Sequence, residues 1–273
     1  MKEGGLLVGC DFSSCPNRRK PIVMALGRGR EERVRLEAFE QLDSLEGFAE
    51  WLVQPRSWIG GFDFPFGLPR ELVEQLGWPR DWASSIRHFA GLSRPEIRAT
   101  FAAFCAARPP GGKFAHRRCD SSAGSSPSMK WVNPPVAYML HAGAASLLAS
   151  GVHLPGLHRG DEARVALEAY PGLFARELIG RRSYKNDDPA KQTAEREAAR
   201  EKLVEALQEG RSRLQLRLEL SPELRDAMLE DASGDHLDAV LCLMQAAWGA
   251  RQGPPVYGLP PDLDPLEGWI VTA

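Results

Sequence analysis

The stretch 58-WIGGFDFPFGLP-69 joins a strand-like apolar run to a single acid. Residues 58–62 are apolar or glycine, which is typical of a buried strand, and Pro65 ends that pattern. Asp63 stands between two phenylalanines. A carboxylate that is buried without a partner loses much of its hydration free energy, so this position indicates that another group compensates the charge of Asp63.

The length and composition are those of an ordinary globular protein. A chain of 273 residues is at the upper end for one domain, and two domains are possible. Hydrophobic residues make up 43% and charged residues 26%, so a core of normal size can form. The net charge of −2 excludes binding of a polyanion through overall charge, and any nucleic-acid surface must therefore be a local patch.

The five cysteines form no CxxC pair. The N-terminal apolar run is too short for a signal peptide, and no window approaches the ~18 apolar residues of a membrane span. We therefore expect free thiols, a cytoplasmic location and no membrane partner. A zinc site is an alternative for the thiols, although its spacing matches no usual zinc pattern. Its ligands would be Cys10, Cys15, His116 and Cys119.

The N-terminal part predicts a mixed sheet. Three apolar runs lie close enough in sequence to form an antiparallel meander. A helix from Asp43 to Gln54 separates them from a fourth, and this strand–helix–strand order requires a parallel crossover. The four expected strands are residues 6–10, 21–26, 33–39 and 57–62.

The remaining chain alternates helices with one further strand. Residues 108–135 are rich in Pro, Gly and Ser, and we expect them to form one long loop. Asp188 and Pro189 predict the N-cap and first position of a helix that ends at Gly210. The other expected elements are helical pieces over 69–107, a helix over 135–150, a strand over 164–171 and helices that begin near residues 221 and 235.

Acids mark the ends of several of these elements. Asp11, Asp63 and Glu168 end strands, or nearly so, while Asp235 and Asp238 share one face in the first turn of the last helix. A mixed sheet flanked by helices brings such ends together along one edge. Oxygen-only clusters of this kind favour Mg²⁺ or Mn²⁺. Two such ions about 3.5–4 Å apart activate water and stabilise the leaving oxygen in phosphodiester cleavage.

Each acid also has a purely structural interpretation. One shared metal site explains all the acids together, and for that reason we favour it. The alternatives are a turn capped by Asp11 at Ser13–Ser14, an Asx turn from Asp63 to the amide of Phe66 or Gly67, a pair of Glu168 with Arg176, an N-cap at Asp235, and a buried ion pair at Asp238.

Five segments, in this order, resemble the DUF429 family of predicted ribonuclease H-like nucleases. The most specific is hydrophobic–Asp–hydrophobic–Pro–hydrophobic–Gly–Leu–Pro at residues 62–69, and the resemblance covers roughly residues 6–250. The segments are Cys10–Ser13, Phe62–Pro69, Leu167–Pro171, Tyr184–Lys185 and Asp235–Ala239.

The resemblance implies a ribonuclease H-like α/β fold, with a five-stranded mixed sheet whose first three strands are antiparallel and which helices flank. It implies that Asp11 is the carboxylate shared by two metal ions and that Glu168 is the family's acid before Tyr/His-Pro. The family commonly has a second Glu after that proline, and here Gly172 replaces it. We expect one domain over residues 1–273, with an inserted helical and basic-loop region at about 70–150.

Basic residues are candidates for nucleic-acid contacts. The loop at 108–130 has several cations, one acid and nearby aromatic residues, a composition that suits a phosphate backbone with stacked bases. The alternatives are a loop that packs on its own domain and, for Lys185, an ordinary surface lysine. His236, between two proposed ligands, is either a general base or structural. The candidate contacts are Lys113, Arg117, Arg118, Lys130 and Lys185.

These patterns predict a metal-dependent nuclease that uses Mg²⁺ or Mn²⁺, with DNA and RNA both open as substrates. A phosphotransferase of the related sugar-kinase and actin type and a non-catalytic binding protein of the same fold are the alternatives. The predicted catalytic residues are Asp11, Asp63, Glu168 and Asp238, and the predicted metal ligands are Asp11, Asp63, Asp235 and Asp238.

Overall fold

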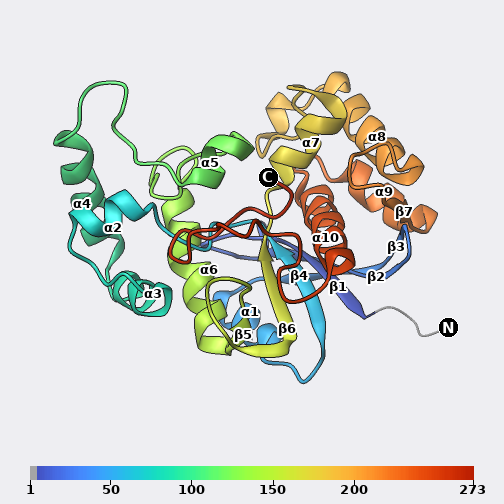
Figure 1. The fold of residues 1–273 in the computed structure, drawn as a ribbon. Coiled ribbons are helices and arrows are strands. Elements are labelled where there is room, and N and C mark those ends of the chain that lie inside the picture. The colour runs from blue at the N-terminus through green and yellow to red at the C-terminus, as the bar shows by residue number, and fades with distance from the viewer. Residues whose placement is uncertain (1–4) are drawn as a thin grey trace.

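A computed structural model describes residues 5–273, and residues 1–4 of the expected domain lie outside the described part. Its strands form one sheet in the order β5-β6-β4-β1-β2-β3-β7 (Figure 1). The expected number of five strands is wrong within this part, because two short strands extend the sheet at its edges. The strands are β1 Leu6–Asp11, β2 Ile22–Arg30, β3 Arg33–Leu42, β4 Trp58–Phe62, β5 Val152–His153, β6 Asp161–Glu168 and β7 Arg217–Glu219.

Ten α-helices and one 3-10 turn accompany the sheet in the described residues. None of these helices is both long and apolar enough to cross a membrane. They are α1 Leu45–Leu52, α2 Arg70–Gln75, α3 Trp82–Ala90, α4 Arg94–Ala106, α5 Arg118–Ala123, α6 Val136–Ser150, α7 Pro171–Ile179, η1 Pro189–Lys191, α8 Ala194–Glu209, α9 Pro222–Glu230 and α10 Asp235–Gln252.

The mixed topology expected from the sequence is confirmed. β1 pairs with β2, and β2 with β3, in antiparallel orientation. β4 lies parallel to β1, and β6 lies parallel to β4. The crossover between β3 and β4 runs through α1, which begins after Ser44 because the side chain of this residue accepts the Gly47 amide at 3.0 Å.

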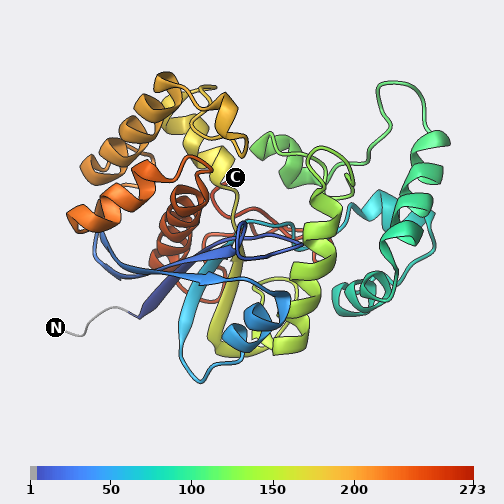
Figure 2. The same ribbon diagram turned by 180° about the vertical axis from the view of Figure 1, so that it is seen from behind.

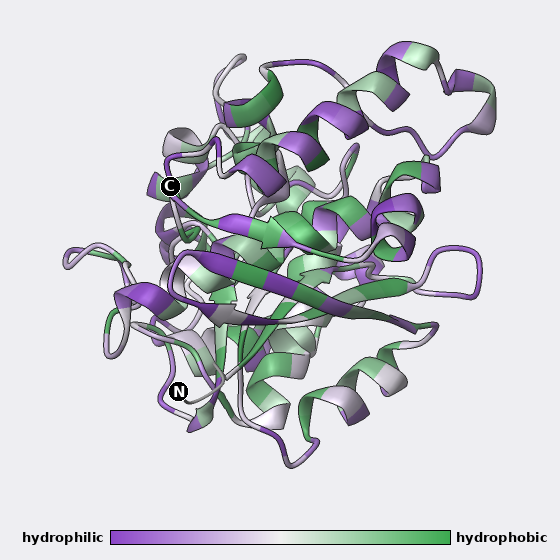
Figure 3. Ribbon diagram, turned by 90° about the vertical axis from the view of Figure 1, so that its right-hand side faces the viewer, coloured by the Kyte–Doolittle hydropathy of each residue, from purple (hydrophilic) through white to green (hydrophobic). Residues whose placement is uncertain are grey.

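The two faces of the sheet carry different helices (Figure 2). Alternate residues of a strand point to opposite faces. Val8, Cys10 and Phe62 belong to the core cluster that includes α1 and α6, whereas Leu7 belongs to the cluster that includes α8 and α10. Toward the β3 edge the burial alternates along the strand, and Figure 3 shows hydrophilic and hydrophobic residues alternating on that side.

Glycines allow α10 to approach the sheet closely. A Cβ added at Gly9 would lie 1.9 Å from the Ala239 carbonyl oxygen, and one at Gly61 would lie 2.5 Å from the Cys242 carbonyl oxygen. Only residues without a Cβ permit such a contact between a strand and a helix backbone. The first turn of α10 is therefore fixed above the ends of β1 and β4.

Two expected elements differ from the structure. The region 108–135 is not a continuous loop, since α5 forms within it. The expected helix from Asp188 is interrupted: Asp188 caps only η1, Gln192 is extended, and α8 begins after Thr193, whose side chain accepts the Arg196 amide. The inserted helices α2, α3 and α4 lie to one side of the sheet (Figure 1).

Candidate metal centre

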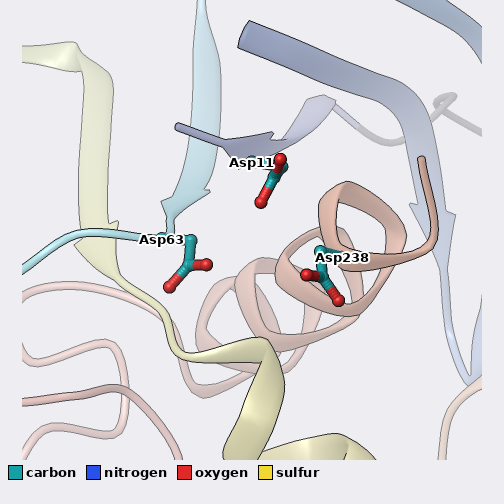
Figure 4. A group of neighbouring side chains, drawn as sticks. All are labelled: Asp11, Asp63 and Asp238. Carbon is teal, nitrogen blue, oxygen red and sulfur yellow. The ribbon is translucent and has the colours of Figure 1, made fainter. Parts of the chain in front are cut away.

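Three of the predicted acids meet at one edge of the sheet. Asp11 ends β1, Asp63 directly follows β4, and Asp238 lies in the first turn of α10. One carboxylate oxygen from each residue lies within 4.8 Å of the others. Figure 4 shows the three side chains around a common space between the strand ends and the helix.

The strand register explains why Asp11 and Asp63 are neighbours. Cys10 pairs with Phe62 in parallel register, and the Asp63 amide continues the ladder with a 2.9 Å bond to the Cys10 carbonyl. The next two residues, Asp11 and Asp63, therefore point to the same face. That face is the one that α10 covers, so Asp238 approaches from above.

The surroundings of Asp11 and Asp63 disfavour their negative charge. Within residues 5–273 neither carboxylate has a hydrogen-bond or ion-pair partner, and only the nearby charge of Lys185 favours their ionised form. Burial, with the nearby charge of Asp238, raises the pKa of Asp11 well above its usual value. The same two causes raise the pKa of Asp63 from 3.8 to about 7. Both side chains are thus available to a cation, which would restore their charged form.

Asp238 differs because protein groups compensate it. Its side chain is completely buried, the Tyr184 hydroxyl donates to Oδ1, and the Lys185 ammonium donates to Oδ2. Burial lowers the pKa of Lys185, but the nearby Asp238, Tyr184 and Asp11 together outweigh burial and raise this pKa well above its usual value. The buried ion pair expected as the alternative for Asp238 is present, and it coexists with the aspartate group.

Asp235 lies outside this group of three. Its Oδ1 is 3.6 Å from the Lys20 ammonium, and its side chain is 10% exposed. The expectation that Asp235 caps α10 is wrong, because Gly234 occupies the cap position. The fourth predicted metal ligand is therefore adjacent to the cluster and already has a cationic partner.

Glu168 points away from the three aspartates. It pairs in register with Phe62, so its side chain belongs to the opposite face from Asp63. Both of its oxygens bind Arg117, at 2.6 and 2.8 Å, and Oε2 also accepts the Phe66 amide at 2.9 Å. The predicted pairing of Glu168 with Arg176 is wrong. Arg176 instead donates to the Tyr170 hydroxyl and to the Ala123 carbonyl.

The chain matches the family model described as "Protein of unknown function (DUF429)" over residues 9–261. It belongs to the DUF429 family. No curated protein and no solved structure is similar enough to this DUF429 chain to be matched.

The basic residues of this DUF429 protein lie in different settings. Arg117, one of the predicted nucleic-acid contacts, is 1% exposed, and its guanidinium is bound to Asp120 and Glu168. Arg118 is exposed and forms an ion pair with Asp262 at 2.7 Å. Lys113 is exposed and Lys130 is half-buried, and as nucleic-acid contacts they and Arg118 stay predictions.

The other candidate groups have structural roles in this DUF429 protein. His236 directs Nδ1 to Asp231 at 2.8 Å and packs edge-on against Phe39. The five cysteines are free thiols. Among the described residues, the aspartates are the one group of three or more His, Cys, Asp or Glu side chains placed to hold a metal ion, so the expected zinc set does not assemble.

The sequence did not predict the buried network around Arg117. Arg117 binds Asp120 at 2.9 Å and the carbonyl of Glu267 at 3.1 Å, which joins α5 to the C-terminal segment. The Glu267 carboxylate accepts the amides of Arg70 and Arg118. One signal was available: Asp120 is the single acid in a basic loop, three residues after Arg117.

Proposed function

We propose that this DUF429 protein is a metal-dependent phosphodiester hydrolase that acts on nucleic acid. The observation that carries the proposal is the position of Asp11 and Asp63, two carboxylates without protein partners that lie within 4.8 Å of a third. Like charges at such distances repel unless a proton or a cation compensates them. Oxygen ligands alone suit Mg²⁺ or Mn²⁺, so the donor set fits the expected metal.

The protein's own groups have separate roles in this proposal. Asp11, on the central strand, is the candidate ligand shared by two ions, and Asp63 and Asp238 flank it. Tyr184 and Lys185 fix the rotamer of Asp238 through its two oxygens. When bound, the ions would activate water and neutralise charge on the scissile phosphate.

The topology supports a ribonuclease H-like fold. Five neighbouring strands have the order β6-β4-β1-β2-β3. As the resemblance implies, β1, β2 and β3 are antiparallel to one another in turn, whereas β4 and β6 run parallel to β1. β5 and β7 extend these five strands without interrupting them.

The free cysteines are consistent with a reducing compartment, and we propose the cytoplasm as the location of this protein.

The direct test is cleavage of end-labelled DNA and RNA, each single- and double-stranded, in Mn²⁺. We expect the wild type to cleave at least one substrate and the Asp11→Asn/Asp63→Asn variant to be slower by about 100-fold or more. Asp226→Asn, at an exposed position on α9, is the matched control and should retain activity. Equal cleavage by the double variant, or none by the wild type, would contradict the proposal.

Two measurements separate the alternative functions. Calorimetric titration with ATP tests the phosphotransferase, which requires nucleotide binding in the presence of Mg²⁺. A melting temperature that rises with Mn²⁺ while all four nucleic acids stay intact would favour a non-catalytic metal-binding protein.

A further inference from the structure

A small cavity adjoins the aspartate cluster. Its volume is about 170 Å³, and its lining includes Asp63 on one side and Glu168 with Arg117 on another. It lies between the segment after β4, the connection between α5 and α6, and the end of β6. Asp63 therefore belongs both to the candidate metal centre and to the wall of this cavity.

The cavity is mainly apolar and has few free polar groups. Ser125 donates to Asp120 at 3.1 Å, whereas the hydroxyl of Ser126, which also lines the cavity, has no hydrogen-bond partner among residues 5–273. The Tyr170 ring adds an aromatic surface. The principal apolar lining residues are Phe64, Pro65, Val136, Met139, Ala169 and Ile270.

We infer that this cavity receives one unpaired base of a nucleic acid whose backbone lies at the aspartate cluster, an inference that rests on the proposed function. Ligand pockets for drug-sized molecules have volumes of about 300–1,000 Å³, so this smaller space suits a single heterocycle and excludes a base pair. Apolar and aromatic walls suit the faces of a base. The free Ser126 hydroxyl suits the hydrogen-bonding edge of a base.

The charges around the cavity disfavour other ligands. An anion such as phosphate would lie beside Asp63, and the guanidinium of Arg117 is already compensated by Asp120 and Glu168. A second cation would find Glu168 already bound by Arg117 and the Phe66 amide. A neutral, flat ligand therefore fits these surroundings better than a charged one.

The inference sets the substrate class. A base can enter the cavity only if it is unpaired, so the protein should act on single strands, on frayed ends or on flipped nucleotides. Continuous duplexes should bind more weakly, because unstacking and unpairing the base costs free energy.

The test fills the cavity without changing the aspartates. Ser126→Trp places an indole in it, Val136→Trp fills it from the start of α6, and Ser121→Trp on the exposed side of α5 is the matched control. Binding of fluorescent single-stranded and duplex oligonucleotides is measured in EDTA, with adenosine and uridine as competitors. We expect at least a tenfold loss of single-strand affinity in both cavity variants and none in the control.

The outcomes distinguish this inference from the proposed function. If both tryptophan variants fold and bind single strands and nucleosides like the wild type, the inference is overturned, even if Mn²⁺-dependent cleavage is found. If the cavity variants lose nucleoside and single-strand binding while the wild type cleaves nothing, the base site stands and the nuclease proposal fails. The melting temperature of each variant confirms that it is folded.

Discussion

The carboxylates near the sheet edge differ in the groups that compensate their charge. Glu168 has a guanidinium and a backbone amide, and Asp238 has a hydroxyl and an ammonium. Asp11 and Asp63 have no such group within residues 5–273. The nearby charge of Lys185 offsets the burial of these two carboxylates only in part, so each should bind either a proton or a cation.

Asp63 should make the metal-free protein less stable as the pH rises. Its pKa is about 7 in the folded chain against 3.8 ordinarily, so between these values the folded state binds more protons than the unfolded state. The free energy of unfolding then falls with rising pH, by about 2 kcal/mol once residual water contact is allowed for. Urea unfolding in EDTA at pH 5 and pH 8 measures this, and Asp63→Asn should reduce the difference.

The same titration couples cation binding to pH. Mn²⁺ must displace the proton from Asp63, so we expect its affinity to fall as the pH drops below about 7. Asp226→Asn should follow the wild type in both measurements. A pH dependence of stability that is identical in wild type and Asp63→Asn would contradict the assignment.

Lys185→Gln should destabilise the protein chiefly when no metal is bound. The variant leaves Asp238 buried without its ammonium partner. Because the Lys185 side chain is 40% exposed, we expect the free energy of unfolding to fall by about 1–2 kcal/mol. Breaking a fully buried pair typically costs about 3–5 kcal/mol. Mn²⁺ should restore most of the loss by replacing the ammonium, as urea unfolding with and without Mn²⁺ would show.

The exposed lysine Lys202 on α8 provides the control for this experiment. Lys202→Gln should change the free energy of unfolding little in either condition. A loss for Lys185→Gln that is equal with and without Mn²⁺ would show that its ammonium has no relation to a cation site.

At the scale of secondary-structure elements, the contact of α10 with β1 and β4 positions Asp238. Backbone atoms of Ala239 and Leu243 leave no room for a side chain at Gly9. On β4, the backbone of Cys242 likewise leaves no room for a side chain at Gly61. The position of the candidate metal centre therefore depends on two strand glycines, Gly9 and Gly61, that have no side chain.

Gly9→Ala should weaken both the fold and cation binding. The new Cβ would lie 1.9 Å from the Ala239 oxygen and 2.3 Å from the Leu243 nitrogen, and backbone atoms cannot rotate away. We expect the free energy of unfolding to fall by about 3 kcal/mol and Mn²⁺ to bind at least tenfold more weakly, because α10 must move. Gly112→Ala, where the nearest atom would be 3.9 Å away, is the control. Unchanged Mn²⁺ affinity in a destabilised Gly9→Ala protein would refute the coupling.

The ion pair between β6 and the start of α5 should matter for stability more than for metal binding. Glu168→Gln should cost about 3 kcal/mol, the lower end for a broken buried pair, because Asp120 still faces Arg117. Its Mn²⁺ affinity should stay within about threefold of wild type, since Glu168 lies on the other face of the sheet. Glu162→Gln, exposed on the same strand, is the control. A large loss of Mn²⁺ affinity in Glu168→Gln would instead support the predicted catalytic role.

At the scale of the whole molecule, the candidate centre joins both halves of the chain. The C-terminal segment returns to the site, where the Val271 amide bonds to the Glu168 carbonyl at 2.8 Å. Gln245 on α10 donates to the Val271 carbonyl and to Thr272. A ligand at the aspartates therefore contacts elements from residue 11 to residue 238, and its binding free energy should appear as global stability.

Mn²⁺ should raise the melting temperature of the whole protein. At 100 times the dissociation constant, mass action adds about 2.7 kcal/mol to the free energy of unfolding. Scanning calorimetry should show this gain in the wild type and its absence in Asp11→Asn/Asp63→Asn. An equal shift in both proteins would place the cation site elsewhere.

The sequence alone determined the elements whose signals are local. Apolar runs that end in an acid identified β1, β4 and β6, and short connections identified the meander. Motif spacing gave five acids as one set and led to the family; three of them, Asp11, Asp63 and Asp238, meet in the structure. Strands of two or three residues, such as β5 and β7, are too short to show a period, and so the number of strands was missed.

Only the tertiary structure decided which acids meet. Asp63 and Glu168 both lie at strand ends, but the register with Phe62 places their side chains on opposite faces of the sheet. The tertiary structure also shows that Arg117 is buried and that Lys185 binds Asp238. Strand register and helix placement depend on contacts between residues distant in sequence, and a local pattern contains no record of them.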